Sequence, residues 1–333
     1  MPQEPFDFVI PLYRQRWNTR AVLEGLTLHY QPRAIHIITP EPEVAALRSQ
    51  SSHWQVAPLD IHAEEPFFQP QGLDKETICA ELDLGESLYT PGWFYQQLLK
   101  LGAAAGIPTL SEWYMVWDSD LLPVATWPLV TQQAAGSQHA FALLQHNQWG
   151  NASIVAKWDR WIREVLGVEP LTDVEGTFVP HHMWFKQAHL QTFQQQVGRY
   201  FQSDDHWLLL MMRSANQFGT FSEYWAYVSW VAAQSPADLC FYPYAEYGTT
   251  TERFFDDGTA VFSAALRQCL AIASPDGFSP AYTEVDAFIR AEYGAEALPS
   301  SLAFESSPRH LKKGKENMHI EEQRSRWHPL NQS

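Results

Sequence analysis

The sequence predicts an α/β fold: a Rossmann-type, mostly parallel sheet flanked by helices, with a helical second half. The main observation is that strand-like apolar runs at 6–13, 34–40 and 54–60 alternate with helix-like segments at 21–30 and 43–50. This β-α-β-α-β order favours a parallel sheet with helices on its faces. The strand-like runs are also continuously apolar, as in parallel strands that are buried on both faces.

The length of 333 residues fits one large α/β domain or two closely joined lobes. We predict one domain over 1–300, because the composition changes only after that point. Residues 301–333 are polar, with a basic cluster followed by an acidic one, and are predicted to form a flexible tail.

The segment 61–90 is rich in Pro, Gly and charge and is predicted to be a long loop. A helix is predicted over 91–108, where Trp93, Gln96 and Lys100 share one face at spacings of three and four. A polar and aromatic face suits a helix beside a cleft, although a helical lysine often extends to solvent. Further strands are predicted at 113–117, 141–147, 177–185 and 238–247, and further helices at 158–166, 203–215 and 221–234.

The charge balance is acidic, with 22 Lys and Arg against 38 Asp and Glu, a formal net charge of −16. Such a protein binds nucleic acid poorly, because the phosphate backbone repels it, so no nucleic-acid partner is expected. The basic cluster at 309–315 is the exception. It is either part of a solvated tail or an arm that touches phosphate groups or, peripherally, an anionic membrane surface.

The three cysteines, Cys79, Cys240 and Cys269, show no paired spacing, which suits a reducing compartment. No secretory signal is visible at the N-terminus, and the strongest apolar run, 207–212, is too short to span a bilayer. We therefore expect a cytoplasmic protein without a transmembrane segment.

In the stretch YMVWDSDLLPV, residues 114–124, an apolar, strand-like run is followed directly by Asp118 and Asp120. In open α/β sheets, ligands bind outside the carboxyl ends of the strands, and a turn there can aim both carboxylates at one point. Two hard oxygen donors suit Mg²⁺ or Mn²⁺, and the oxygens of a nucleotide diphosphate would complete the metal's shell. The alternative is that the aspartates only terminate a strand.

Four motifs carry a resemblance to a known family: PGWFYQQLLKL, VWDSDLLPV, FVPHHMWF and SEYWAY. Together they resemble a largely uncharacterised bacterial family of GT-A-type, glycosyltransferase-like proteins with a DxD motif. The resemblance covers about residues 5–250. It implies a GT-A-like fold, with a nucleotide-sugar-binding half at 1–125 and an acceptor half at 126–300. It also implies a hexosyltransferase-like enzyme that moves a sugar from a nucleotide-diphosphate donor to a hydroxyl acceptor, with surface polysaccharide or another glycan as the expected product.

The resemblance also implies roles for particular residues. Asp118 and Asp120 would hold the metal and the donor diphosphate, with Gln97 and Lys100 on the helix next to the site. Pro11, Tyr13 and Arg14, in the loop after the first strand, would lie against the nucleotide. Whether Lys100 contacts phosphate or only braces Asp118 stays open.

A histidine from His181 and His182 is a candidate third metal ligand, as GT-A enzymes often take one beyond the DxD. Adjacent strand residues point to opposite faces, so at most one of the two can face the metal. We prefer His182; the alternative is a core histidine bonded to backbone.

Glu223 is the candidate general base. An inverting transferase needs a group that takes the acceptor's proton. Glu223 lies in a predicted first helical turn capped by Ser222, with Tyr227 one turn later. Its alternative role is a carboxylate favoured by the helix dipole. Asp204 and Asp205 precede another helix and carry the same ambiguity.

Two other functions are compatible with the sequence. A nucleotidyltransferase that makes nucleotide sugars would share the sheet and the metal, but it would normally carry a Gly-rich loop where this chain has PLYRQRWNTR. A non-catalytic glycan-binding protein fits the 14 tryptophans, although it would have no need of both aspartates.

Overall fold

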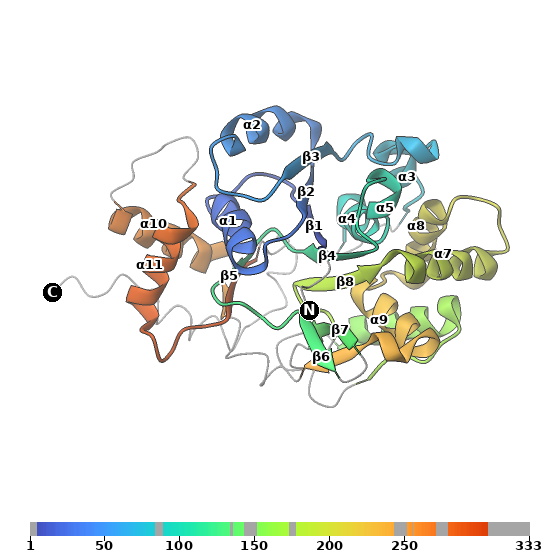
Figure 1. The fold of residues 1–333 in the computed structure, drawn as a ribbon. Helices are drawn as coiled ribbons and strands as arrows, with labels where there is room; N and C mark the ends of the chain where they lie inside the picture. Colours follow the sequence, from blue (N-terminus) through green and yellow to red (C-terminus); the bar gives the residue numbers. More distant parts are fainter. Residues whose placement is uncertain are drawn as a thin grey trace.

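A five-stranded sheet in the order β3-β2-β1-β4-β8 forms the centre of the protein in the computed structural model (Figure 1). Its strands are β1 (Asp7–Pro11), β2 (Ala34–Thr39), β3 (Leu59–Ala63), β4 (Trp113–Trp117) and β8 (His182–Lys186). The first four run parallel, and β8 pairs antiparallel with β4. The structure describes residues 5–83, 89–133, 136–142, 152–172, 178–242, 252–254, 256–270 and 279–305. The predicted α/β fold with a mostly parallel sheet is confirmed.

Helices flank this sheet, with α1 (Thr19–Tyr30) and α4 (Pro91–Leu101) on opposite sides of it in Figure 1. On the α1 side lie α10 (Asp256–Leu270) and α11 (Tyr282–Tyr293); on the α4 side lie α3 (Lys75–Ala80), α5 (Ala103–Gly106), α7 (Gln187–Phe201), α8 (Trp207–Phe218) and α9 (Glu223–Gln234). The others are α2 (Glu41–Ser51), α6 (Ala152–Trp161), a π-helical turn (Ile162–Leu166) and 3-10 turns at Gln69–Gln71 and Pro236–Asp238.

Two small sheets join the central one. The first, in the order β10-β11-β5, contains β10 (Glu252–Phe254), β11 (Ser301–Phe304) and β5 (Leu121–Pro123). The second, in the order β6-β7-β9, contains β6 (Val130–Gln133), β7 (Gly136–Ala142) and β9 (Cys240–Tyr242). Because β11 is buried along its whole length, the boundary predicted at residue 300 is wrong, and the ordered domain reaches at least Glu305. The rest of the predicted tail, 306–333, lies outside the described residues.

Two predicted segments are also corrected. The third strand begins at Leu59 rather than at Trp54, and 61–90 is not a single long loop, since it contains the end of β3 and the helix α3. Asp74 explains that helix start, because its side chain accepts a hydrogen bond from the backbone N–H of Thr77. Of the strand predicted over 141–147, the first two residues belong to β7 and the rest lie outside the described residues.

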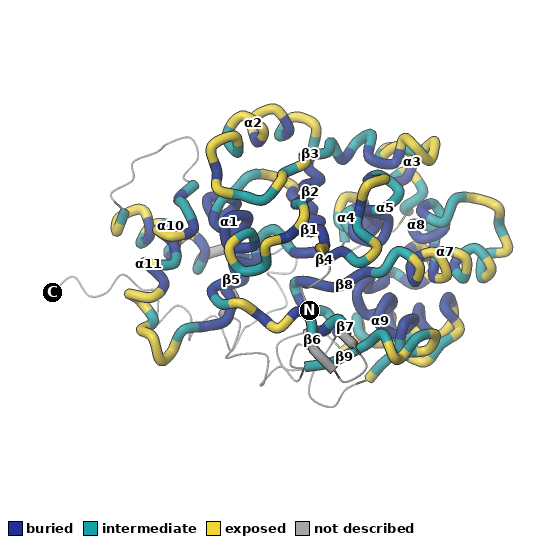
Figure 2. Tube along the Cα trace, viewed as in Figure 1, coloured by how far each residue is buried: buried dark blue, intermediate teal, exposed yellow. Residues whose placement is uncertain are grey.

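Burial follows this layering, and Figure 2 shows the central strands as a largely buried band with exposed residues on the outer helices. One polar group is fixed inside this band. Asp7, fully buried at the start of β1, accepts hydrogen bonds from Arg33 Nε (2.8 Å) and from the backbone N–H of Ser111 (2.9 Å). Asp7 thereby ties β1 to the residues that precede β2 and β4.

Candidate metal and substrate site

The turn Asp118–Ser119–Asp120 lies where the chain leaves the central sheet at Trp117 and enters the small sheet at Leu121. Three backbone hydrogen bonds hold this turn. Leu121 N donates to Asp118 O (3.0 Å), Asp118 N donates to His181 O (2.8 Å), and Phe304 N donates to Asp120 O (3.0 Å). The two aspartates are therefore positioned by β5, by the residue before β8 and by β11.

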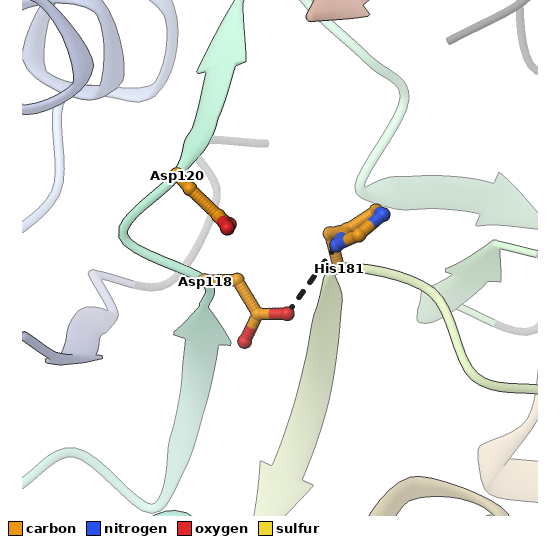
Figure 3. A group of neighbouring side chains, drawn as sticks. All are labelled: Asp118, Asp120 and His181. Atoms are coloured by element: carbon orange, nitrogen blue, oxygen red, sulfur yellow. Dashed lines mark ion pairs between the residues drawn. The ribbon is translucent and has the colours of Figure 1, made fainter. Parts of the chain in front are cut away.

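Asp118, Asp120 and His181 converge on one point (Figure 3). Each offers one ligand atom, and these atoms lie within 4.8 Å of one another. The Nδ1 atom of His181 is 3.4 Å from Asp118 Oδ2. Two carboxylate oxygens and an imidazole nitrogen form a donor set that suits a divalent cation such as Mn²⁺, so the residues present fit the predicted metal.

The choice of His182 as the third ligand is wrong. His182 begins β8 and is only 2% exposed, and its ring stacks on Trp117 with 5.0 Å between ring centroids. Burial, together with the neighbouring His181, lowers the pKa of His182 to about 3. Since adjacent residues point to opposite faces, His181 is directed to the aspartates and His182 to the aromatic core.

Lys100 on α4 is buried and forms ion pairs with two carboxylates. Its Nζ lies 2.9 Å from Asp118 Oδ1 and 2.9 Å from Glu223 Oε1. Burial alone would lower the pKa of Lys100, but the negative charges of Asp118 and Glu223 hold it well above its ordinary value. Lys100 is therefore a charged brace for Asp118.

The two aspartates differ in their pKa. Burial alone would raise the pKa of Asp118, but Lys100 and His181 hold it well below its usual range. Burial and the adjacent charge of Asp118 raise the pKa of Asp120 to about 6. A cation bound between them would relieve the repulsion that disfavours the Asp120 carboxylate.

A cleft of about 260 Å³ opens over this turn. Trp93, Gln96, Gln97 and Lys100 line one side of it, so the predicted cleft-facing side of α4 is confirmed. The remaining lining residues come from the DxD turn, from Trp158, from the segment before β8, from the start of α9 and from the end of β11: Asp118, Ser119, Asp120, Trp158, Val179, Pro180, His181, Ser222, Glu223, Tyr224 and Glu305.

The loop after β1 is not part of this lining. Pro11 is buried at the end of β1, whereas Tyr13 is 74% exposed and Arg14 is also exposed. Arg16, two residues further on, is closer to the site. Its guanidinium donates to Phe304 O (2.7 Å), and its charge acts on Asp120.

Glu223 lies at the cleft as the first residue of α9, and the predicted Ser222 cap is present, with its side chain accepting from Trp225 N. Tyr227, one turn after Glu223, is buried away from the cleft, where its hydroxyl accepts a hydrogen bond from Lys186 N. Tyr224 faces the site instead, donating to Asp118 Oδ1 (3.3 Å). Asp205 pairs with Arg213, and neither Asp204 nor Asp205 lines the cleft.

Glu305, like Tyr224, is a site residue that sequence reasoning missed. Its Oε1 lies 3.4 Å from His181 Nε2, on the far side of the ring from Asp118. No local pattern marks it, because Glu305 reaches the site only through the pairing of β11 with β5.

The fold and the site together define an α/β protein with a candidate divalent-cation centre at the carboxyl end of a central strand. A model of the DUF6492 family, described as a family of unknown function, matches residues 14–267, more than half of the chain. The chain therefore belongs to this family. A search among curated proteins found no match.

Two solved structures are similar in layout. The apo form of mouse xyloside xylosyltransferase 1 is 10% identical, with a TM-score of 0.41, over 76% of this chain and 88% of that one. The PaToxG glycosyltransferase is 11% identical, with a TM-score of 0.33, over 87% of this chain and 85% of that one. At these low scores, the activity of neither enzyme is carried over from the comparison.

Proposed function

We propose that this protein is a metal-dependent glycosyltransferase that moves a sugar from a nucleotide-diphosphate donor to a hydroxyl group. The observation that carries the proposal is the convergence of Asp118, Asp120 and His181 at the carboxyl end of β4, inside a cleft. Parallel α/β sheets bind ligands at that edge. The GT-A-like arrangement of sequence motifs gives the reaction class.

Asp118, Asp120 and His181 would hold Mn²⁺ or Mg²⁺. The bound ion would supply Lewis-acid stabilisation of the charge that develops on the leaving diphosphate. The chain's own contribution is to fix the ligands. Lys100 and Tyr224 hold Asp118 Oδ1, while Asp118 Oδ2 faces His181.

The rest of the cleft suits a sugar ring. Trp93 offers a flat aromatic ring and Gln96 an amide on the same side of the cleft, and carbohydrate binding uses both kinds of group. We propose that the nucleoside of the donor binds against the loop after β1, in which the ring of Tyr13 is exposed and available for stacking. Since β1 and β4 are parallel neighbours, this loop leaves the same edge of the sheet as the DxD turn.

Glu223 remains our candidate for the general base. Its carboxylate lines the cleft that contains the candidate metal ligands, and general bases act on protons within hydrogen-bond reach. Its ion pair with Lys100 adds a second role, which is to hold the ammonium against Asp118. We propose a glycan hydroxyl, in surface polysaccharide or another glycan, as the acceptor.

The test is a release assay across a panel of nucleotide sugars, with and without Mn²⁺. We expect Mn²⁺-dependent release of nucleoside diphosphate from one donor, even by slow hydrolysis without an acceptor. Release by the Asp120→Asn variant at the wild-type rate would contradict the assignment of the site. Formation of pyrophosphate and a nucleotide sugar from a nucleoside triphosphate and a sugar phosphate would identify a nucleotidyltransferase instead.

A further inference from the structure

We propose that Glu305 is a positioning residue for the metal ligand His181. This inference rests on the proposed metal site and adds a residue to it that lies beyond the part of the chain matched by the family model, 14–267. Glu305 would act through the imidazole ring and would not itself be a ligand.

The geometry places His181 between two carboxylates. Its Nδ1 is 3.4 Å from Asp118 Oδ2, and its Nε2 is 3.4 Å from Glu305 Oε1. Glu305 is outside the group of three residues whose ligand atoms lie within 4.8 Å of one another. One ring nitrogen therefore faces the aspartates, and the other faces Glu305.

This arrangement matches what a metal-binding histidine needs. A histidine that ligates through one nitrogen commonly donates the N–H of the other to a carboxylate, which fixes the tautomer and the ring orientation. Here, Glu305 would accept the Nε2–H, and the Nδ1 lone pair would point to the cation between Asp118 and Asp120. Figure 3 shows Nδ1 as the nitrogen on the aspartate side of the ring.

The backbone holds Glu305 firmly enough for this role. Glu305 N donates to Phe254 O of β10 (2.7 Å), and the preceding residue, Phe304, donates from its N to Asp120 O (3.0 Å). Arg16 donates to Phe304 O (2.7 Å). The same strand end therefore carries Glu305 and also binds the DxD turn, so the orienting carboxylate and a metal ligand are fixed relative to each other.

The experiment measures Mn²⁺ affinity by calorimetry and by the EPR signal of free Mn²⁺, at one fixed pH and without donor. We expect Glu305→Gln to weaken Mn²⁺ binding by about 10- to 100-fold, the usual effect of losing such an outer-shell carboxylate. Glu305→Asp keeps the charge but shortens the side chain, and should cause a smaller loss. Thermal unfolding confirms that each variant is folded.

A double-mutant cycle separates positioning from direct ligation. If Glu305 acts through the ring, Glu305→Gln should have no further effect in the His181→Ala background. An equal loss in both backgrounds would mean that Glu305 ligates the ion or acts only through its charge, and would overturn the inference. The matched control is Asp238→Asn, which removes the carboxylate 2.7 Å from His189 Nε2 in another part of the fold and should leave Mn²⁺ affinity unchanged.

The outcomes also distinguish the two proposals. Wild-type protein that binds no Mn²⁺ would overturn both the metal site and the role of Glu305. If the wild-type protein binds Mn²⁺ and the Glu305→Gln and Glu305→Asp variants bind it equally well, only the role of Glu305 would be overturned.

Discussion

At the scale of single residues, Asp118 has the most constrained position in the site. One carboxylate oxygen accepts from Lys100 and Tyr224, and the other faces His181. Because Lys100 also pairs with Glu223, the orientation of Asp118 depends on α4 and α9 together. A buried ammonium thus fixes the first candidate metal ligand, Asp118, whereas the pKa of Asp120 is raised.

Asp120→Asn should abolish Mn²⁺-dependent donor binding while the fold stays intact. It should also raise the melting temperature of the metal-free protein at pH 7. The pKa of Asp120, raised to about 6, means that folding disfavours its carboxylate, so native stability falls as the pH rises from about 4 to 6. Calorimetry and melting curves against pH test both statements, with Ser119→Ala as the control in the same turn. Unchanged donor and metal affinity in Asp120→Asn would remove it from the metal site.

Glu223→Gln should lower acceptor-dependent turnover by about 10²–10⁴-fold, the usual contribution of a positioned proton acceptor. Donor affinity should stay near that of the wild type, since the metal ligands are untouched. Lys100→Met is the matched variant, because it breaks the same ion pair and keeps the Glu223 carboxylate. Steady-state kinetics with and without acceptor provides the measurement.

Two other results would argue against Glu223 as the general base. Equal losses of turnover, donor affinity and stability in Glu223→Gln and Lys100→Met would mean that Glu223 only holds Lys100. A retained anomeric configuration of the product, seen by NMR, would remove the need for a separate base.

At the scale of elements, Asp7 joins three segments of the central sheet from one end of β1. Burial alone would raise its pKa, but the nearby His36 ring and the hydrogen bonds from Arg33 and Ser111 hold it well below the usual range. A carboxylate whose pKa is lowered by folding stabilises the fold at pH values above its ordinary pKa of 3.8. This stabilisation is lost as the pH falls. Asp7 and Asp120 therefore contribute to acid stability with opposite signs.

Asp7→Asn should reduce the free energy of unfolding at pH 7 by about 1–3 kcal/mol, the range for hydrogen bonds to a charged group. The difference from the wild type should shrink between about pH 5 and pH 3, where the wild-type carboxylate begins to be protonated in the unfolded state. Urea unfolding at several pH values tests this. Asp286→Asn, which breaks an i,i+4 ion pair with the half-exposed Arg290, is the control and should change stability by less than about 1 kcal/mol. A difference that is independent of pH would contradict the role given to the Asp7 charge.

The sequence predicted the elements whose signals are local. The strand 113–117 matches β4 residue for residue, Ser222 caps α9, and the cleft-facing side of α4 follows from spacings of three and four. Of the site, only the residues marked by such local signals were predicted correctly. The alternation of side chains along a strand showed that only one histidine of the pair can face the aspartates, but not which one. His182 was predicted, whereas His181 is the one that faces Asp118 and Asp120. Glu305 depends on β5 pairing with a strand from the far end of the chain, and no spacing within a single segment encodes such a contact.

At the scale of the whole molecule, the ordered body includes β11, and no helix in the described part of the chain is long and apolar enough to cross a membrane. All four residues of β11, Ser301–Phe304, have no solvent exposure. β11 also lies between β10 and β5, so its removal would leave both strands without a partner in that sheet.

Deleting 306–333 should barely change the melting temperature, because that segment is polar with segregated charge. Deleting 301–333 removes β11 as well and should lower the melting temperature by many degrees, since truncating a single buried Phe commonly costs about 3–5 kcal/mol. Differential scanning calorimetry of the two truncations makes the comparison. A large drop already in the shorter deletion would mean that 306–333 packs on the body.

The pairing of β5 with β11 also has a consequence for synthesis on the ribosome. Leu121–Pro123 is synthesised long before its partner strand, Ser301–Phe304. Until that partner is available, an apolar strand edge next to the candidate metal site is unpaired on that side. Such edges promote association between nascent chains, and contacts this distant in sequence form slowly. We therefore expect this sheet to close only after Ser301–Phe304 has been synthesised, and the yield of native protein in cells to depend on chaperones that shield this edge.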